Sequence, residues 1–407
     1  MVRIFLTMNI PKRILYLTTL NLATNPRLVK EIRLALDNSF SVEVICFEFE
    51  NWSKENNEKL KKELANVKFI TIPAGRKPFL PWVLSVVKEQ MCRKLVLLFK
   101  SEKILANAVS RRSSLVIKNL NKVSKPDWVI GHNPGALRAA KFAAEKFTCG
   151  AGFDVEDYHP GEGSNVFLQN LSRKLMQRVL PKMNYVSFAA PLIMEEVKKE
   201  ATAGNKNWFT VLNYFPSAEF CRPGNTNTGK LKLVWFSQNI SFGRGLEQLI
   251  PAIKSNPGIE LHLFGNCNES FRSQWLFGSD NIYLHSSLPQ SELHWQLANY
   301  DVGLALEENE NNLNRNLCLT NKILAYYQSG LYILASKTKA QERFIKENPD
   351  HGMLTSLSSG DLIQTIQKLV EQKESLRKLS PERYENAKEY GWEKESAKLV
   401  EIWKEYH

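Results

Sequence analysis

Short apolar runs alternate with longer amphipathic stretches along most of the chain. In the first half these patterns predict buried strands, and the segments between them predict helices. The expected strands lie at residues 13–20, 41–47, 67–72, within 125–135, 185–188 and 209–213, and the expected helices at 27–37, 54–66, 136–147, within 162–180 and near 192–200.

The same alternation starts again after a break in composition at residues 216–229, which contain two prolines and a Gly/Asn/Thr-rich run. We interpret this break as a linker. The second series predicts strands at 231–236, 259–264, 281–284, 302–306 and 331–335, and helices at 245–254, 291–299 with Ser291 as N-cap, and 320–330.

Two series of alternating strands and helices predict an α/β protein with two doubly wound domains that face each other across a cleft. We place the first domain at residues 1–215 and the second at 230–384. The amphipathic tail, residues 381–406, predicts a long helical region, and we expect its last part, about 385–407, to pack back on the first domain.

Composition favours a globular protein in a reducing compartment. Hydrophobic residues make up 43% of the chain and charged residues 24%, which does not indicate disorder. The six cysteines and seven histidines are dispersed, with no paired or zinc-ligand spacing, so we expect no metal. The N-terminus lacks a signal-peptide pattern, and no apolar run is long enough to cross a membrane. We therefore expect a cytoplasmic protein.

The net charge of +12 is concentrated in one segment, residues 76–125, where twelve Lys and Arg face two acidic residues. Apolar and aromatic residues are interleaved with these charges. Such a segment can lie on an anionic membrane, which would place the protein peripherally on the inner face of the plasma membrane. Equally, it can form helices with a core-facing side and a solvated basic side. No nucleic-acid-binding motif accompanies the charge, so we expect no nucleic-acid partner.

Polar side chains cluster after the strand expected at 302–306. In strand–helix–strand units, ligands bind beyond the carboxyl ends of strands and against helix N-termini. That position contains Glu307, Asn314, Arg315, Asn316, Thr320, Asn321 and Lys322. Alternatively, this stretch is a solvated loop followed by a helix that Thr320 caps.

Polar residues also follow strands of the first half. His132 ends one strand, and it can be either a functional or a buried structural residue. Asp154, Glu156, Asp157 and His159 form an acidic cluster, which could bind acceptor hydroxyls or orient His132. A pair of glycosidase-type carboxylates is a rival interpretation of the cluster. Asn25 and Arg27 occupy the first strand-to-helix turn.

The order of several segments resembles the GT-B glycosyltransferases, specifically the group 1 or family 4 retaining enzymes. PDWVIGHNPGALRAA is similar to the family's PDxIHxHxPGAL segment, and GFDVEDYH stands where the family has DxHD. Further similar segments are VLNYFP, LVWFSQNISFGRGLEQLI, LHLFGN, NIYLHSSLPQSELHWQLANYDVGLALE and TNKILAYYQSG. No single segment is specific to this family, but the order and spacing of the segments along the chain are.

The resemblance implies two Rossmann-like domains and transfer of a sugar from a nucleotide-sugar to an acceptor hydroxyl, with retention and without a cofactor or bound metal. Cations and helix N-termini must then stabilise the leaving diphosphate. The resemblance gives catalytic roles to Arg244, Lys322 and His132, the last beside the donor sugar. The implied donor-binding residues are Gln238, Gly265, Glu307, Asn316, Thr320 and Asn321, and the acceptor-side candidates are Asn25, Arg27, Asp154, Glu156 and Asp157.

Three features depart from the family pattern. Gln238 replaces the first cation of the family's basic pair, and Ala325 replaces a glutamate that typically grips the ribose. The turn that contains Asn25 and Arg27 lacks the family's glycines. Glu307 or the neighbouring asparagines could hold the ribose instead.

These departures leave three functions open. The first is a glycosyltransferase with a saccharide or lipid-linked acceptor, in cell-envelope polysaccharide or glycolipid biosynthesis. The second is a non-catalytic GT-B protein that binds sugar or nucleotide. The third is a nucleotide-sugar epimerase, because fold alone does not settle function.

Overall fold

The structure is a computed structural model that describes residues 11–201, 207–224, 229–308 and 312–405. The chain divides into two compact units, described separately below. The first contains the residues up to Val211 and again from Ser396, and the second contains Leu212–Glu395. The expected N-terminal lead-in at residues 1–10, and parts of the expected linker and of the Asn-rich loop, lie outside the described residues.

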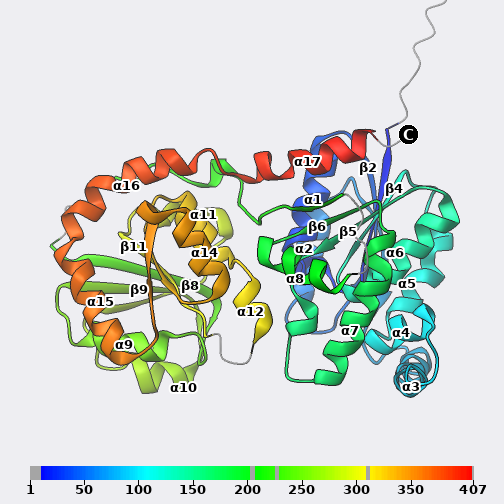
Figure 1. Ribbon diagram of the computed structural model, residues 1–407, viewed down its shortest axis with the longest axis horizontal. Helices are drawn as coiled ribbons and strands as arrows, with labels where there is room; N and C mark the ends of the chain where they lie inside the picture. The colour runs from blue at the N-terminus through cyan, green and yellow to red at the C-terminus, as the bar shows by residue number, and fades with distance from the viewer. Residues whose placement is uncertain (1–10, 202–206, 225–228, 309–311, 406–407) are drawn as a thin grey trace, which may run out of the picture. The chain divides into compact units, whose positions relative to one another are not determined.

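The first unit is built on a parallel sheet of seven strands. In spatial order they are β3 (Lys68–Pro73), β2 (Ser41–Glu48), β1 (Arg13–Thr18), β4 (Trp128–His132), β5 (Gly150–Val155), β6 (Tyr185–Phe188) and β7 (Trp208–Thr210). Helices cover both faces (Figure 1). They are α1 (Pro26–Asp37), α2 (Lys54–Glu63), α3 (Phe79–Leu95), α4 (Glu102–Val109), α5 (Ser113–Asn119), α6 (Pro134–Phe147), α7 (Val166–Val179), α8 (Pro191–Glu200) and the end of α17 (Trp392–Glu405).

The second unit is built on a parallel sheet of six strands, again with helices on both faces (Figure 1). The strand order is β10 (Ile282–His285), β9 (Ile259–Cys267), β8 (Leu231–Ile240), β11 (Val302–Ala305), β12 (Tyr332–Ser336) and β13 (Gly352–Thr355). The helices are α9 (Leu246–Lys254), α10 (Glu269–Phe271), α11 (Gln290–Leu297), α12 (Leu313–Leu317), α13 (Asn321–Gln328), α14 (Lys339–Glu347), α15 (Ser359–Glu371) and α16 (Lys373–Ala387).

The α/β class with two doubly wound parallel sheets is confirmed. Central strands such as β4 and β5 are buried along their whole length, because helices on both faces exclude water from every side chain. This explains why these strands read as continuous apolar runs in the sequence. In each sheet the strand order reverses direction at one point, between β1 and β4 and between β8 and β11. Such a switch point opens a crevice beyond the carboxyl ends of the two strands.

Several element boundaries differ from the expected ones. The tail forms two helices, α16 and α17, and α17 joins the first unit from Ser396 onward. The residues expected to form a linker begin inside the second unit, where Phe220 packs in a core cluster. Pro289, not Ser291, is the N-cap of α11. The Asn-rich loop contains a short helix, α12, which its polar composition conceals.

A buried ion pair joins two elements of the first unit near its switch point. Arg27 of α1 makes a two-pronged contact with Asp154 of β5, with Nε–Oδ2 and Nη2–Oδ1 distances of 2.7 and 2.9 Å. Both side chains are almost completely buried. Arg27 Nη1 also donates to the Val211 carbonyl, and Ser187 Oγ donates to Asp154 Oδ1. The pair therefore ties α1 to the sheet through bonds that water cannot replace.

Replacing Arg27 by Met should lower the free energy of unfolding by about 3–5 kcal/mol, because it leaves the Asp154 carboxylate buried without its cation. Urea denaturation measures the loss. The matched control is Arg33→Met, which breaks a half-exposed pair with Glu63 and should cost at most about 1 kcal/mol. Equal losses in the two variants would show that burial of the Arg27 pair has no special weight.

Candidate active site

Two cations and one carboxylate meet at the switch point of the second unit. Glu307 follows β11, and its side chain is 3% exposed. Lys322 Nζ lies 3.1 Å from Glu307 Oε1, and Arg244 Nη1 lies 3.7 Å from Glu307 Oε2. The Arg244 side chain remains 37% exposed. The carboxylate thus holds both cations while leaving the group one positive charge in excess.

Local packing fixes Glu307 and Lys322. Ser336, at the end of β12, exchanges hydrogen bonds with the backbone N–H and carbonyl of Glu307. Helix α13 sits close to β11 because Gly303 has no side chain there: a Cβ would lie 2.2 Å from the Tyr326 ring. This close approach places Lys322, in the first turn of α13, within contact distance of Glu307.

The N-terminus of α13 offers further groups suited to an anion. Helix N-termini carry partial positive charge and unpaired backbone N–H groups. Thr320 is the N-cap residue, but its side chain makes no capping hydrogen bond. Its buried Oγ1 has no hydrogen-bond partner among the described residues. An oxygen-rich ligand beside Lys322 would supply that partner.

Gln238 and Gly265 lie together where strands β8 and β9 lose regular pairing. The register shifts between Phe236 and Asn239, so Gln238 falls in the irregular stretch, where it is exposed. Gly265 has a φ of 145°, and a Cβ there would lie 2.0 Å from the Ser237 carbonyl oxygen. Only glycine allows this close approach of the two strands. The structure shows no contact between Gln238 and the cation pair.

Other predicted donor-binding side chains are engaged in internal hydrogen bonds. Asn316 Oδ1 accepts from the backbone N–H of Lys339, at the start of α14. Asn321 Oδ1 accepts from Asn213 Nδ2 at 2.8 Å. These bonds brace the loops around the group formed by Glu307, Lys322 and Arg244.

Ala325 lies one turn after Lys322 on α13, in apolar surroundings. It is fully buried and belongs to a core cluster that includes Ile323, Leu324 and Tyr326. A glutamate at this position would have to bury a carboxylate among apolar side chains, unless the helix shifted. The departure from the family pattern is therefore accompanied by packing that suits alanine.

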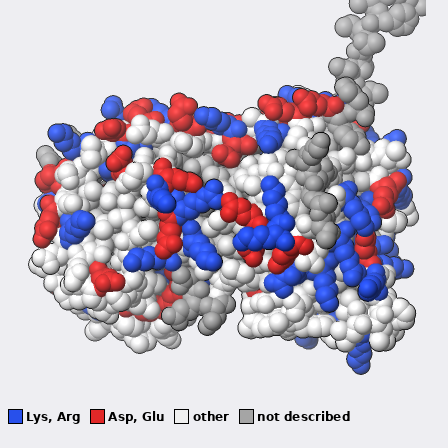
Figure 2. All heavy atoms as spheres, viewed as in Figure 1, with Lys and Arg blue, Asp and Glu red and all other residues white. Residues whose placement is uncertain are grey.

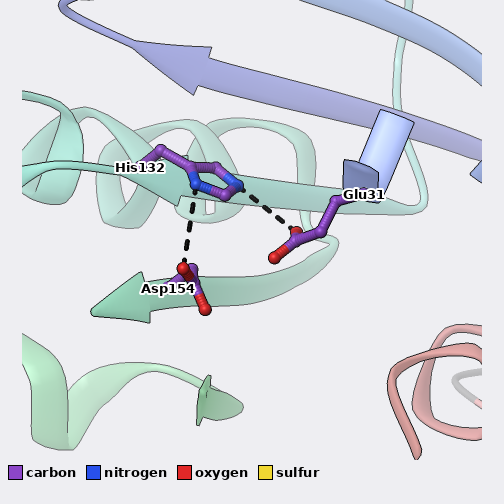
Figure 3. Close-up of side chains that lie close together, drawn as sticks. All are labelled: Glu31, His132 and Asp154. Atoms are coloured by element: carbon purple, nitrogen blue, oxygen red, sulfur yellow. Dashed lines mark hydrogen bonds and ion pairs between the residues drawn. The ribbon is translucent and has the colours of Figure 1, made fainter. Parts of the chain in front are cut away.

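In the first unit, His132 lies between three carboxylates, one from α1, one from β5 and one from the segment that follows β5. Its Nδ1 is 2.8 Å from Glu156 Oε1 and 4.0 Å from Asp154 Oδ2, and its Nε2 is 3.3 Å from Glu31 Oε2. Figure 3 shows the ring at the end of β4, between Glu31 of α1 and Asp154 of β5. The ring is completely buried, and both nitrogens are engaged. The hydrogen bond to a donor sugar that the resemblance implies stays a prediction, and it requires one of these contacts to open.

These neighbours determine the charge of His132. Burial lowers the pKa of the imidazole, but attraction and hydrogen bonding to Glu31 and Glu156 outweigh this effect and raise it to about 10. Burial also raises the pKa of Glu31, although His132 opposes that rise. The ring is therefore an imidazolium at neutral pH, which donates hydrogen bonds but does not accept a proton.

Glu31, His132 and Asp154 also lie close enough together to be considered as metal ligands, since one ligand atom from each falls within 4.8 Å of the others. Their environment disfavours a metal cation. Asp154 already contacts the Arg27 guanidinium with both oxygens, and both ring nitrogens of His132 already contact carboxylates. A metal ion at this position would have to displace the Arg27 guanidinium from Asp154 or compete with it for the carboxylate.

The remaining candidates of the first unit are distributed around this network. Asn25 is the N-cap of α1 and accepts a hydrogen bond from Leu28 N–H, while its buried Nδ2 has no partner among the described residues. Arg27 is committed to Asp154, so it is not poised to bind a phosphate. Asp157 is half-buried, and the Glu156 side chain is 23% exposed. Glu156 is thus the ionic contact of His132 that reaches solvent.

Sequence reasoning missed Glu31. On an amphipathic helix an isolated glutamate normally indicates a solvated face. The available signal was spacing: Glu31 follows Arg27 by four residues, which places both side chains on one face of α1. This spacing indicates that Glu31 lies beside Arg27, itself a candidate site residue.

No protein-family model matches the chain, and no curated protein does. Solved structures do. Anabaena HepE in complex with UDP-glucose has a TM-score of 0.64 at 13% identity, covering 96% of this chain and 98% of that one. Sucrose-phosphate synthase from Thermosynechococcus elongatus has a TM-score of 0.63 at 12% identity, covering 97% and 98%. A putative UDP-N-acetylglucosamine 2-epimerase from Listeria monocytogenes has a TM-score of 0.54 at 14% identity, covering 91% of both chains. The predicted GT-B fold is confirmed.

His132 should remain protonated well above neutral pH, and NMR of histidine-labelled protein should show its ring titrating near pH 10. Its folded pKa exceeds the ordinary value of 6.5, so its ionic contribution to stability is complete below pH 6.5 and is lost as the pH rises through 10. Glu31→Gln should lower the midpoint by more than about one pH unit. His351 is the internal control, because burial lowers its pKa to about 4. A midpoint for His132 near 6.5 would contradict the assigned contacts.

Introducing the family's glutamate at position 325 should destabilise the second unit. We expect Ala325→Glu to lower the free energy of unfolding by about 2–4 kcal/mol, because the carboxylate enters an apolar cluster. Chemical denaturation measures the loss, and the uncharged Ala325→Gln variant separates the cost of charge from the cost of size. An Ala325→Glu protein of unchanged stability would show that the site accommodates the family glutamate.

Proposed function

We propose that the protein is a glycosyltransferase that moves a sugar from a nucleotide-sugar to an acceptor hydroxyl, with retention and without a bound metal. The observation that carries this proposal is the convergence of Arg244 and Lys322 on the buried Glu307, beside the N-terminus of α13. This constellation matches the chemical demand of a leaving nucleoside diphosphate.

As the bond from the sugar to the diphosphate breaks, negative charge grows on the phosphate oxygens. Preorganised cations and helix N-termini stabilise such charge without rearranging. Lys322 is held by Glu307 and lies 5.4 Å from the Trp235 ring, so its Nζ has little freedom to move. Arg244 is more exposed and can meet the diphosphate from solvent. Thr320 Oγ1 would complete the cradle.

The nucleotide-sugar donor is also supported by the solved structures of similar fold. Among these, Anabaena HepE has been solved in complex with UDP and in complex with UDP-glucose. We infer that this chain binds a donor of the same class through its second unit. Glu307 and the backbone near Gly265 are the groups we propose for the ribose or sugar hydroxyls.

In the first unit, we propose that Glu156 contacts the acceptor. It is the partly exposed member of the His132 network, and the hydrogen bond from His132 fixes its position. His132 then acts as a positioning residue. We propose a saccharide or lipid-linked acceptor, in the synthesis of cell-envelope polysaccharide or glycolipid.

A specific observation also favours a second function, a GT-B protein that binds nucleotide or sugar without turnover. Two groups that the resemblance leads us to expect at the donor are missing here. Ala325, packed among apolar side chains, stands in place of the glutamate, and Gln238, which has no charge, stands in place of the first cation. Epimerase activity is a third possibility, which the similar putative epimerase structure keeps open.

The glycosyltransferase proposal predicts that the protein releases nucleoside diphosphate from at least one member of a nucleotide-sugar panel. Arg244→Ala and Lys322→Ala should each lower kcat/KM by about 10²–10³-fold, because each removes a cation from the diphosphate. Lys346→Ala, at an exposed position of α14, is the matched control and should keep full activity.

Three outcomes separate the functions. Diphosphate release that depends on both cations supports the transferase. A rise in melting temperature with UDP, without consumption of any donor, supports the non-catalytic binder. Conversion of a nucleotide-sugar into its epimer, followed by NMR, identifies an epimerase. Unaltered donor turnover in Arg244→Ala and Lys322→Ala would show that the proposed cradle is wrong.

A further inference from the structure

Helix α3 exposes an apolar stripe to solvent. Its members recur at helical spacing along one face: Leu80 (67% exposed), Leu84 (60%), Val87 (49%) and Met91 (56%). The turn that follows α3 continues the apolar surface with Leu97, Leu98 and Phe99, which are 74%, 77% and 53% exposed. We call these seven residues the α3 stripe. Contiguous apolar surface of this kind marks an interaction site.

The stripe is not the core-facing side of the helix. Cys92 is the buried residue of α3, and at 100° per residue it lies about 90° away from the line through Leu84 and Met91, so the stripe does not coincide with the buried position. Contacts that anchor the helix come from positions roughly opposite that line: Glu89 accepts a hydrogen bond from the Arg111 backbone N–H, and Arg93 donates to the Ala108 carbonyl of α4. Helix α3 is thus fixed to the unit on one side and presents its apolar side outward.

A rim of cations surrounds the stripe. Arg76 and Lys77 precede α3, Lys94 lies in its last turn, and Lys100 and Lys103 follow the exposed turn; all five are exposed. Within the described part of the chain, none of the five has an acidic partner. Figure 2 shows Lys and Arg gathered over the region of α3 to α5. The surface thus combines exposed apolar side chains with uncompensated positive charge.

We propose that the α3 stripe and its cationic rim dock the protein on an anionic phospholipid bilayer. Apolar side chains of an interfacial helix enter the boundary between headgroups and acyl chains, while Lys and Arg contact the phosphates. Helix α3 has 17 residues and is about 25 Å long, enough for such contact in the membrane plane. Among the described residues, no helix is both long and apolar enough to span a bilayer.

Charge decides between this occupant and a second copy of the chain. Pairing two α3 stripes would bring together two segments with twelve Lys and Arg and two acidic residues each. Like charges at such an interface oppose association. An anionic bilayer offers an apolar environment to the α3 stripe and negative charge to the cationic rim. This inference does not depend on the proposed function, because membrane binding requires no donor turnover.

The test is co-sedimentation of the full chain with vesicles of phosphatidylcholine alone and of phosphatidylcholine mixed with phosphatidylglycerol. We expect binding to the mixed vesicles, weakening with added salt. Leu84→Asp/Met91→Asp should abolish it. The matched control is Phe277→Asp, which changes a residue of the second unit that is 84% exposed and should leave binding intact.

Charge is tested separately. Lys94→Gln/Lys100→Gln should lower the partition coefficient by about tenfold or more. Equal binding to neutral and anionic vesicles, or unchanged binding of the Leu84→Asp/Met91→Asp protein, would overturn the proposal. A second result would also overturn it: light scattering shows a dimer in the absence of lipid, the Leu84→Asp/Met91→Asp variant loses this dimer, and the unmodified protein does not bind vesicles. Circular dichroism verifies that the variants fold.

Discussion

Burying a carboxylate requires a cation beside it, and both units of this protein meet that requirement at their switch points. In the second unit Lys322 and Arg244 compensate Glu307. In the first, Arg27 compensates Asp154 and the His132 imidazolium compensates Glu31. Without these pairs the desolvation cost of each carboxylate would disrupt the strand ends that hold it. The two groups differ in exposure: the pairs named for the first unit are buried, whereas in the second unit the Arg244 side chain is 37% exposed to solvent.

Much of the fold was predictable because doubly wound sheets require a recognisable pattern of apolar and polar residues. Strands buried on both faces, such as β4, are short continuous apolar runs, and the helices between them are amphipathic. The elements that escaped prediction carry weak local signals. Helix α12 lies in a run of asparagines, and β13 begins at Gly352 with only four residues. Their stability comes from tertiary packing, which a sequence window does not contain.

The candidate site was predictable only in part, for a similar reason. Position after a strand and before a helix predicts that Glu307, Thr320 and Lys322 gather at one edge of the sheet. It does not predict which oxygen takes which hydrogen bond, so the use of Asn316 as a brace for α14 could not be foreseen. Likewise, Arg27 carries the same charge in a buried pair as in an open anion site. Only the distance to Asp154 distinguishes the two.

The electrostatics of the two units also restrict the chemistry. A histidine whose pKa is raised to about 10, with both ring nitrogens engaged, cannot serve as a general base at neutral pH. Its contribution is to hold Glu156 in place and to neutralise Glu31. In the transfer that we propose, stabilisation of the developing anion falls to Arg244, Lys322 and the N-terminus of α13. Because these groups stabilise charge rather than move protons, the arrangement favours a reaction whose main demand is the departure of an anionic leaving group.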